Sequence, residues 1–365
     1  WNGENMCGII GYSGPKEPLP ILINGLSRLE YRGYDSAGIA ISDGNKITVE
    51  KKEGKLEVLK NHLKDNNIKG NIGIGHTRWA THGVPNDVNA HPHSDNNEEF
   101  AIIHNGIIEN YAEIKKDLLE EGFEFKSDTD TEVVAVELSR KWNGQLLETV
   151  TDVAKTLEGT YALVVTTTKE EGTIVAGRLM SPLVLGVGEN EVFLASDSAA
   201  ILEHTNKMIF LENGDFVEIK NGQYKLFDSE LNEIEREIQE IDWEVSEAEK
   251  LGYDHFMYKE ILEQSEVIER TISGRLETTS KEIPIKQDEA SKYEKIWIVA
   301  CGTAYHAGLF GKDLFEKVLG VPVSVELASE FRYREPIVGE NDLGIVISQS
   351  GETMDTIAAT ELLKE

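Results

Sequence analysis

The sequence has 365 residues, enough for two domains of about 150 residues each, and it is strongly acidic. Lys and Arg total 36 against 66 Asp and Glu, so the formal net charge is −30. Because such a chain repels phosphate groups, its charge argues against nucleic acid and anionic membranes as partners, but not against a small anionic substrate. A hydrophobic content of 40% is typical of a globular protein and too high for a disordered one.

The two cysteines, Cys7 and Cys301, stand far apart in the sequence. They can build neither a disulfide framework nor a cysteine metal site, so we expect a reducing, cytoplasmic setting. No run approaches about 18 apolar residues, so no membrane-spanning helix is expected. We interpret residues 1–6 as lying outside the fold, either an untranslated leader ahead of a start at Met6 or a tag remnant. The chain ends within a helical pattern, so we expect it to be cut there.

Short apolar runs alternate irregularly with helical patterns up to residue 227. Strands are predicted at 7–12, 37–41, 72–74, 100–103, 161–166, 173–176, 192–194, 216–220 and 223–227. Helices are predicted through Leu22, Leu26 and Leu29, through Ile107, Tyr111, Ile114 and Leu118 with Gly122 as the cap, and through Val134, Leu138 and Trp142. Asn221-Gly222 predicts a tight hairpin. This irregular order favours a layered α+β domain over a regular βαβ repeat.

The pattern changes twice after residue 227. Residues 228–250 hold ten acidic residues and two basic ones, which indicates a solvated connector or an exposed helix face, and a helix is predicted over 254–274. From Lys295 a buried strand, a helical pattern to about 319 and strands at 321–327 and 343–347 predict a parallel α/β domain. The expected organisation is therefore a domain over 7–227, a linker with connecting helices over 228–290, and an incomplete domain over 291–365.

Cys7 directly follows Met6, which is normally trimmed before a small residue. A chain that begins at Cys7 carries a thiol and an α-amine on one residue, with ordinary pKa values of about 8.5 and about 8. The amine can therefore accept the thiol proton, which makes Cys7 a candidate nucleophile with its own base. The alternative is a small buried strand residue.

Five of the nine histidines fall between residues 76 and 104. We interpret this region as the edge of a pocket, where Arg78 offers a fork for a carboxylate and Asn105 with the Gly106 N–H offers two donors to an oxyanion. A zinc site is the rival interpretation, but no His-Glu-x-x-His pattern or standard ligand spacing is present, so no metal is expected. A third interpretation is histidines that are hydrogen-bonded within loops.

Two further polar segments stand at predicted helix starts. Residues 129–132 read Thr-Asp-Thr-Glu, which is good capping chemistry, although Asp130 could also hold a substrate ammonium. Residues 348–353 follow a buried strand and open a helix, so their hydroxyls and N–H groups could cradle a phosphate or simply cap the helix. Residues 301–303 follow the preceding strand, so both segments are expected at the carboxyl edge of one parallel sheet.

Together these motifs resemble the glutamine–fructose-6-phosphate aminotransferase (isomerising) family, the glucosamine-6-phosphate synthases. Segments 7–11, 28–38, 76–83, 89–93, 104–109 and 129–132 look like the family's glutaminase domain. Segments 301–303, 328–334 and 348–353 look like its sugar isomerase (SIS) domain. The resemblance implies an N-terminal-nucleophile fold, which is a four-layer αββα sandwich, followed by a parallel-sheet isomerase domain.

The resemblance also implies an activity that needs no cofactor. Cys7 would hydrolyse glutamine through a thioester, and ammonia would pass through a channel to a site that converts fructose 6-phosphate to glucosamine 6-phosphate, in a homodimer when the enzyme is full length. The implied roles are Asn105 and Gly106 in the oxyanion hole, Arg32 near the nucleophile, Arg78 with Thr81 and His82 on the glutamine carboxylate, Asp130 on its amine, Trp79 as the channel gate, and Thr303, Ser348, Gln349, Ser350 and Thr353 on the sugar phosphate.

Two positions depart from the resemblance: Ala304 stands where the family often has Ser, and Ser265 where it usually has Pro. We expect the second isomerase subdomain to lie beyond Glu365, so this chain would retain the glutaminase half-reaction only. Two alternatives remain. A phosphoribosyl or asparagine amidotransferase shares a Cys-first domain but carries no loop like 348–353, and a non-catalytic sugar-phosphate sensor would not need Cys7, Arg78, Asn105 and Asp130 together.

Overall fold

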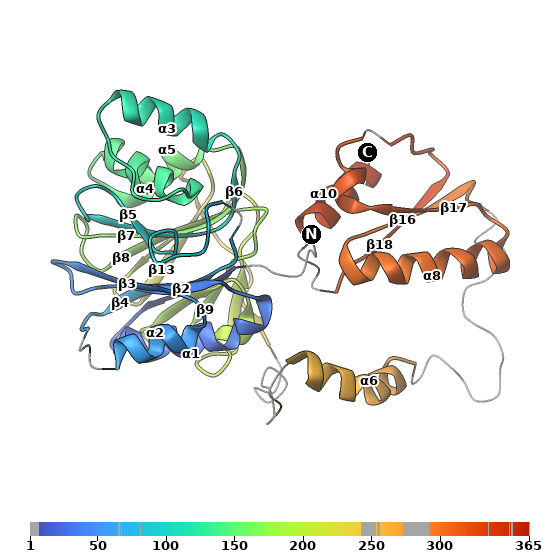
Figure 1. The fold of residues 1–365 in the computed structure, drawn as a ribbon, viewed down its shortest axis with the longest axis horizontal. Coiled ribbons are helices and arrows are strands. Elements are labelled where there is room, and N and C mark those ends of the chain that lie inside the picture. Colours follow the sequence, from blue (N-terminus) through green and yellow to red (C-terminus); the bar gives the residue numbers. More distant parts are fainter. Residues whose placement is uncertain are drawn as a thin grey trace. The chain divides into compact units, whose positions relative to one another are not determined.

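The computed structural model describes residues 7–64, 66, 68–80, 82–241, 253, 256–272, 292–334, 336–349, 351 and 353–364. The chain divides into two compact units, one formed by Asn5–Glu249 and one that contains Lys250–Glu365 (Figure 1). Among the described residues, no helix is both long and apolar enough to cross a membrane.

Two antiparallel sheets form the centre of the first unit. The strands of the first sheet are β1 (Gly8–Ser13), β2 (Ser36–Ser42), β3 (Ile47–Glu53), β4 (Ile72–Arg78), β9 (Val184–Val187), β10 (Val192–Ala195), β11 (Lys207–Phe210) and β15 (Gln239–Glu240). Those of the second are β5 (His93–Ser94), β6 (Phe100–Ile108), β7 (Gly159–Thr167), β8 (Thr173–Leu179), β12 (Phe216–Lys220), β13 (Gln223–Phe227) and β14 (Glu233–Ile234). The strand orders are β15-β11-β9-β10-β1-β4-β2-β3 and β14-β13-β12-β8-β7-β6-β5.

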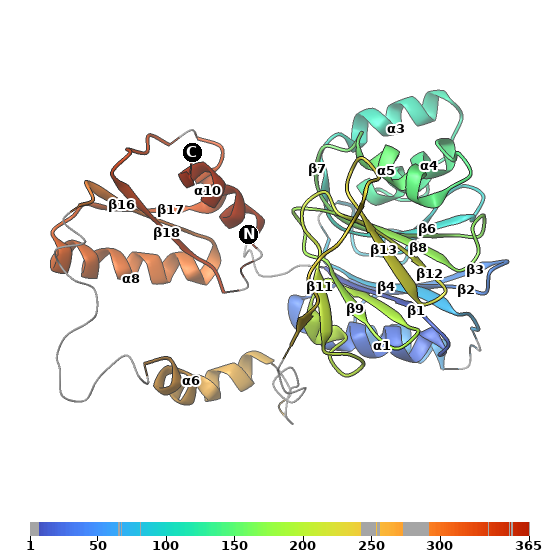
Figure 2. The ribbon, with the colours of Figure 1, turned by 180° about the vertical axis from the view of Figure 1, so that it is seen from behind.

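Helices cover the outer face of each sheet, which produces four layers (Figures 1 and 2). The helices α1 (Pro18–Arg28) and α2 (Leu56–Leu63) pack on the first sheet, and α3 (Tyr111–Glu120), α4 (Asp130–Arg140) and α5 (Leu146–Ala154) lie on the side of the second. Successive strand residues point to opposite faces, so Ile9 enters the core between the sheets while Ile10 packs beneath α1. The predicted αββα sandwich is confirmed.

Three sequence predictions for the first unit differ from the structure. Ile107 was placed on a helix, but it lies in β6, and α3 begins only at Tyr111. Trp142 lies beyond the end of α4 and packs edge-on against Phe100, with the ring centroids 5.5 Å apart. The acidic segment after residue 227 is not all connector, because β14 pairs with β13 and β15 pairs with β11.

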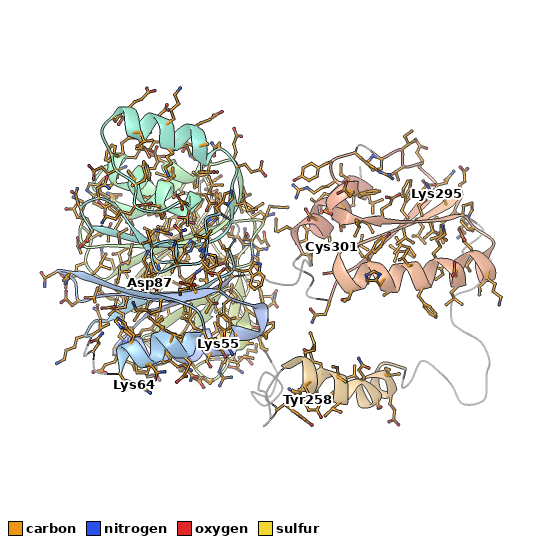
Figure 3. All side chains as sticks on the ribbon, viewed as in Figure 1. Lys55, Lys64, Asp87, Tyr258, Lys295 and Cys301 are labelled. Carbon is orange, nitrogen blue, oxygen red and sulfur yellow. The ribbon has the colours of Figure 1, made fainter. Side chains whose placement is uncertain are left out.

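The second unit contains a parallel three-stranded sheet, as the sequence predicted. The strands are β16 (Lys295–Ala300), β17 (Val323–Leu327) and β18 (Asp342–Ile347), in the order β17-β16-β18. The helices are α6 (Phe256–Ile272), α8 (Gly302–Leu319), α9 (Ala328–Phe331) and α10 (Met354–Lys364). Lys295 and Cys301 mark the two ends of β16 (Figure 3), and Cys301 is the N-cap residue of α8.

Candidate active site

Cys7 lies at the start of β1, beside the end of the neighbouring strand β4. Gly8 pairs with Thr77 in the antiparallel ladder, so Cys7 faces the residues that follow Thr77. A Cβ on Gly8 would stand 2.5 Å from the Thr77 hydroxyl, and this close approach requires glycine. The N–H of Trp79 donates to the Cys7 sulfur over 3.1 Å, and the thiol donates back to the Trp79 carbonyl over 3.6 Å.

Asn105 reaches Cys7 from the second sheet. Its amide Nδ2 donates to the carbonyl oxygen of Cys7 over 3.0 Å, which joins β6 to the start of β1. The next residue, Gly106, has φ +130°, and a Cβ there would stand 2.0 Å from the Thr160 carbonyl oxygen. Only glycine therefore lets β6 keep this path past the pocket.

The guanidinium of Arg78 is buried at the end of β4 and is already partly committed. Its Nη2 donates to the carbonyl oxygens of His82 and Gly83, the second over 3.0 Å. Its Nη1 lies 3.9 Å from a carboxylate oxygen of Asp35 and has no hydrogen-bond partner within the described parts of the chain. Arg78 thus holds the turn after β4 and keeps one N–H-bearing atom for a further acceptor.

Asp130 is the first residue of α4, where the positive end of the helix dipole favours a carboxylate. One carboxylate oxygen accepts the N–H of Ile108 over 2.9 Å, and the other accepts the Thr131 hydroxyl over 3.4 Å. Thr129 caps the helix by accepting the N–H of Glu132 over 3.3 Å. The predicted capping chemistry is therefore present, and Asp130 nevertheless lines the pocket beside Cys7.

Four of the five clustered histidines are buried beneath this pocket. Burial lowers the pKa of His76 to about 3 and also lowers the pKa values of His91, His93 and His104. His93 bonds to the Thr129 hydroxyl and His104 to the Thr131 hydroxyl, each over 3.0 Å. The rings of His76 and His91 pack against each other with their centroids 4.3 Å apart and their planes tilted by 30°. These neutral rings support the pocket wall from within.

The structure brings most of the predicted glutaminase residues into one small pocket. The pocket is lined by Cys7, Arg78, Trp79, His82, His91, His104, Gly106, Thr129, Asp130 and Thr131. Trp79, the expected gate, is 38% exposed. Thr81 lies outside the described residues, as does the side chain of Arg32. No specific role could be predicted for His91, His104, Thr129 or Thr131, because nothing in their spacing shows which side chains turn into the pocket.

The loop that carries His91 is held by a half-buried lysine from the first sheet. The ammonium of Lys51, on β3, donates to the carbonyl oxygens of Val88, Ala90 and Pro92 over 3.0, 2.7 and 3.2 Å. All three of its N–H groups thus have main-chain acceptors. This role could not be predicted, since a lysine next to a second lysine in the sequence reads as an ordinary exposed charge.

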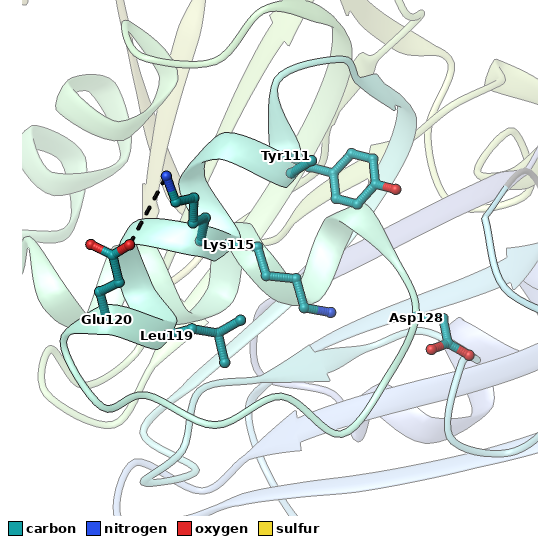
Figure 4. Close-up of a pocket in the computed structure, with 7 residues that line it drawn as sticks. Tyr111, Lys115, Leu119, Glu120 and Asp128 are labelled. Carbon is teal, nitrogen blue, oxygen red and sulfur yellow. Dashed lines mark ion pairs between the residues drawn. The ribbon is translucent and has the colours of Figure 1, made fainter.

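A second hollow lies outside this pocket, along α3. It is lined by Tyr111, Ala112, Lys115, Lys116, Leu119, Glu120 and Asp128 (Figure 4). The hollow is wide and open, and Lys116 pairs with Glu120 along its helix at 4.0 Å. Tyr111 packs edge-on against His82, so this hollow adjoins the site rather than forming it.

In the second unit, the predicted phosphate segments do meet at one sheet edge. β16 and β18 pair in parallel with Ala300 opposite Ile347, so residues 301–303 and 348–353 follow directly from adjacent strand ends. The Ser348 hydroxyl accepts the N–H of Gly351 over 2.9 Å. Thr303 and Gln349 are exposed at this edge, and Thr353 immediately precedes α10. Ser350 lies outside the described residues.

Comparisons with known proteins agree with this geometry. A family model described as a glutamine amidotransferase domain matches residues 61–257, and one described as a SIS domain matches residues 290–365. The chain is 50% identical over 357 residues to glutamine–fructose-6-phosphate aminotransferase [isomerizing] of Clostridium perfringens, covering 97% of this chain and 58% of the relative. It is 47% identical over 360 residues to the protein of that name from Aquifex aeolicus, covering 99% and 60%.

The chain thus spans about three fifths of the length of these curated relatives. Among solved structures, it is similar to a glutamine phosphoribosylpyrophosphate amidotransferase from B. subtilis, with a TM-score of 0.55 and 22% identity, covering 94% of this chain and 69% of that one. At this low identity, the structural similarity supports only the fold described above. Because the amidotransferase model matches more than half of the chain, the chain belongs to the glutamine amidotransferase family.

Proposed function

We propose that the first unit hydrolyses glutamine at Cys7. The observation that carries this proposal is that two hydrogen-bond donors reach Cys7: the Trp79 N–H lies 3.1 Å from its sulfur, and the Asn105 amide lies 3.0 Å from its carbonyl oxygen. A nucleophile beside donors that point into the same small space is the arrangement that acyl transfer requires.

In the proposed reaction, the Cys7 sulfur attacks the side-chain amide carbon of glutamine. A free α-amine on Cys7 takes the thiol proton and passes it to the leaving nitrogen, so ammonia departs and a γ-glutamyl thioester remains. Water then attacks the thioester, which releases glutamate and restores the thiol. The Asn105 amide and the Gly106 N–H stabilise the oxyanion formed in each half of the reaction.

Charged groups on either side of the pocket suit the two ends of the glutamine backbone. Asp130 carries a negative charge at the start of α4, which suits the α-ammonium. Arg78 has an Nη1 without a hydrogen-bond partner among the described residues, which suits the α-carboxylate. We propose these two residues as the substrate anchors, with His82 and Thr81 beside the carboxylate. Arg32 near the nucleophile and Trp79 as the ammonia gate complete the proposed set.

We propose that the ammonia serves the conversion of fructose 6-phosphate to glucosamine 6-phosphate. The names of the relatives support this substrate pair, and the polar residues Thr303, Ser348, Gln349 and Thr353 at one sheet edge support a phosphate site on the second unit. We include Ser350 in this proposed site from the sequence alone. The match of this unit to the SIS family favours a sugar phosphate over the phosphoribosyl acceptor of the similar solved structure.

The test is glutamate release by the full chain processed to begin at Cys7, compared with Cys7→Ala. We expect the parent to release glutamate and Cys7→Ala to release none, because Cys7 is the only cysteine among the described residues that line the pocket, and the hydroxyls of Thr129 and Thr131 already hydrogen-bond to histidines. The matched control is Cys301→Ala, which removes the other cysteine, the N-cap residue of α8 in the second unit, and should keep the parent rate. Parent-level turnover by Cys7→Ala would overturn the proposal.

A further inference from the structure

We propose that His76 is a positioning residue that locks the side-chain amide of Asn105 with its N–H groups toward Cys7. The inference rests on the proposed glutaminase function and deepens it. Asn105 can stabilise an oxyanion only if its NH₂ group, and not its oxygen, faces the reacting atoms. An amide can turn over by rotation about its terminal torsion, so something must hold it in the useful orientation.

The hydrogen bonds at the two ends of the amide leave one consistent orientation. At one end lies the carbonyl oxygen of Cys7, which can only accept, so the nearby amide atom at 3.0 Å must be the donor Nδ2. At the other end lies His76 Nε2, which is 2.9 Å from Asn105 Oδ1 and 3.0 Å from the carbonyl oxygen of His104. Since the His104 oxygen also only accepts, Nε2 must carry the proton, and it therefore faces the amide oxygen.

The surroundings of His76 keep that proton on Nε2. The ring is fully buried, and its Nδ1 has no hydrogen-bond partner within the described parts of the chain, so a proton there would be an unpaired buried donor. Burial is also the main reason that the pKa of His76 falls to about 3, although its hydrogen bonds to Asn105 and to the His104 backbone act to raise it. The His91 ring packs against the His76 ring, with the two ring centroids 4.3 Å apart. At neutral pH the ring therefore has one proton, on the nitrogen that faces Asn105.

Removing this donor would free the Asn105 amide to turn its oxygen toward the pocket. An oxygen there would repel the developing negative charge instead of binding it. Complete loss of an oxyanion donor lowers kcat by about 10²–10³-fold. Because an unlocked amide still spends part of its time in the useful orientation, we expect loss of the His76 donor to lower kcat by about 10–100-fold with little change in KM.

The experiment compares two substitutions of His76 in the full chain processed to begin at Cys7. In His76→Gln the side-chain NH₂ reaches approximately the position of Nε2 and still donates, whereas His76→Leu fills similar space without a donor. The matched control is Ile74→Ala, which alters the same face of β4 two residues earlier in the core between the sheets. Steady-state glutamate release gives kcat and KM, and thermal unfolding gives the stability of each variant.

We expect His76→Leu to lose kcat at nearly constant KM, His76→Gln to recover most of it, and Ile74→Ala to lose stability but not kcat. Equal kcat losses in His76→Leu and His76→Gln, or a loss that follows stability alone, would overturn the inference. A parent without glutaminase activity would instead overturn the proposed function. In that case ¹⁵N NMR of the His76 imidazole still tests the inference. A proton on Nδ1 at neutral pH would refute the proposal that His76 holds the Asn105 amide.

Discussion

The main-chain N–H of Trp79 donates to the sulfur of Cys7 over 3.1 Å, although 72 positions separate the two residues in the chain. The contact exists because β1 and β4 are neighbours in the first sheet, with Gly8 opposite Thr77, so the start of one strand faces the residues just past the other. Asp35 helps to hold this segment, since its carboxylate accepts the N–H of Ala80. A donor aimed at the sulfur stabilises negative charge on it.

Asn105→Ala should lower kcat for glutamine hydrolysis by about 10²–10³-fold while KM changes little, because an oxyanion donor acts mainly in the transition state. Steady-state glutamate release is the measurement. Asn96→Ala serves as the control, since Asn96 is another amide that donates to a main-chain carbonyl, at an exposed position. A rise in KM at unchanged kcat would place Asn105 on the ground-state substrate instead.

Asp130→Asn should show the opposite pattern, with KM raised and kcat nearly kept. The substitution retains an oxygen that can accept the Ile108 N–H and removes only the charge, so local structure should survive. Loss of a charged hydrogen bond costs about 1.5–3 kcal/mol, which corresponds to a rise in KM of about 10–100-fold. An unchanged KM would show that the glutamine ammonium does not bind to Asp130.

Acid should destabilise the first unit through its buried histidines. Burial holds the pKa values of His76, His91, His93 and His104 below the ordinary value of 6.5, so below that pH the unfolded state binds protons that the folded state does not. The stabilising contribution is thus present above about pH 6.5 and is lost as the pH falls toward the folded pKa values. Between its folded and unfolded pKa values, each ring changes the free energy of unfolding by about 1.4 kcal/mol per pH unit.

Urea unfolding at about pH 7.5 and about pH 5.5 measures this slope. His91→Phe should reduce the slope of the unfolding free energy against pH by about one proton, because it removes one titrating ring. The buried Nδ1 of His91 has no hydrogen-bond partner among the described residues, so the substitution breaks no bond there. Ile102→Val, a core substitution without a titrating group, should lower stability equally at both pH values. If His91→Phe leaves the slope unchanged, the ring is not held neutral in the folded state.

Gly106→Ala should unfold the site, whereas Gly122→Ala should be tolerated. Both glycines have positive φ, at +130° and +93°, but a Cβ on Gly106 would stand 2.0 Å from the Thr160 carbonyl oxygen and one on Gly122 would meet nothing within 4 Å. Backbone strain should lower the free energy of unfolding of either variant by about 1–2 kcal/mol. Overpacking should lower that of Gly106→Ala by about 1–3 kcal/mol more. Thermal unfolding of both variants measures the difference, and equal losses would contradict the crowding at Gly106.

Local signals predicted those parts of the fold that depend on local chemistry. The hairpin at Asn221-Gly222 was correct in both strands because both turn residues adopt the positive φ that this turn demands. Ile107 was misplaced because an apolar spacing of four fits a helix, while its actual position follows from pairing with Thr160 on β7. The strand β15 could not be predicted from the sequence, because it pairs through its backbone at a sheet edge and needs no apolar pattern.

The candidate site divides in the same way. Cys7, Asn105 and Asp130 were predicted because a single short motif indicates the chemistry of each. The structure places them in one pocket or at its edge. The role of His76 could not be predicted, since it depends on a hydrogen bond to a residue 29 positions away across two sheets. Lys51 was missed for the same reason, because its three acceptors lie on a separate loop.

The most direct test of the account is detection of the glutamyl group on Cys7 itself. The full chain processed to begin at Cys7 would be mixed with glutamine, quenched in acid within the first turnover and digested for mass spectrometry. The account predicts one glutamyl group on the peptide that contains Cys7 and none on the peptide that contains Cys301. Glutamate release at full rate with no trace of that group on the Cys7 peptide would contradict it.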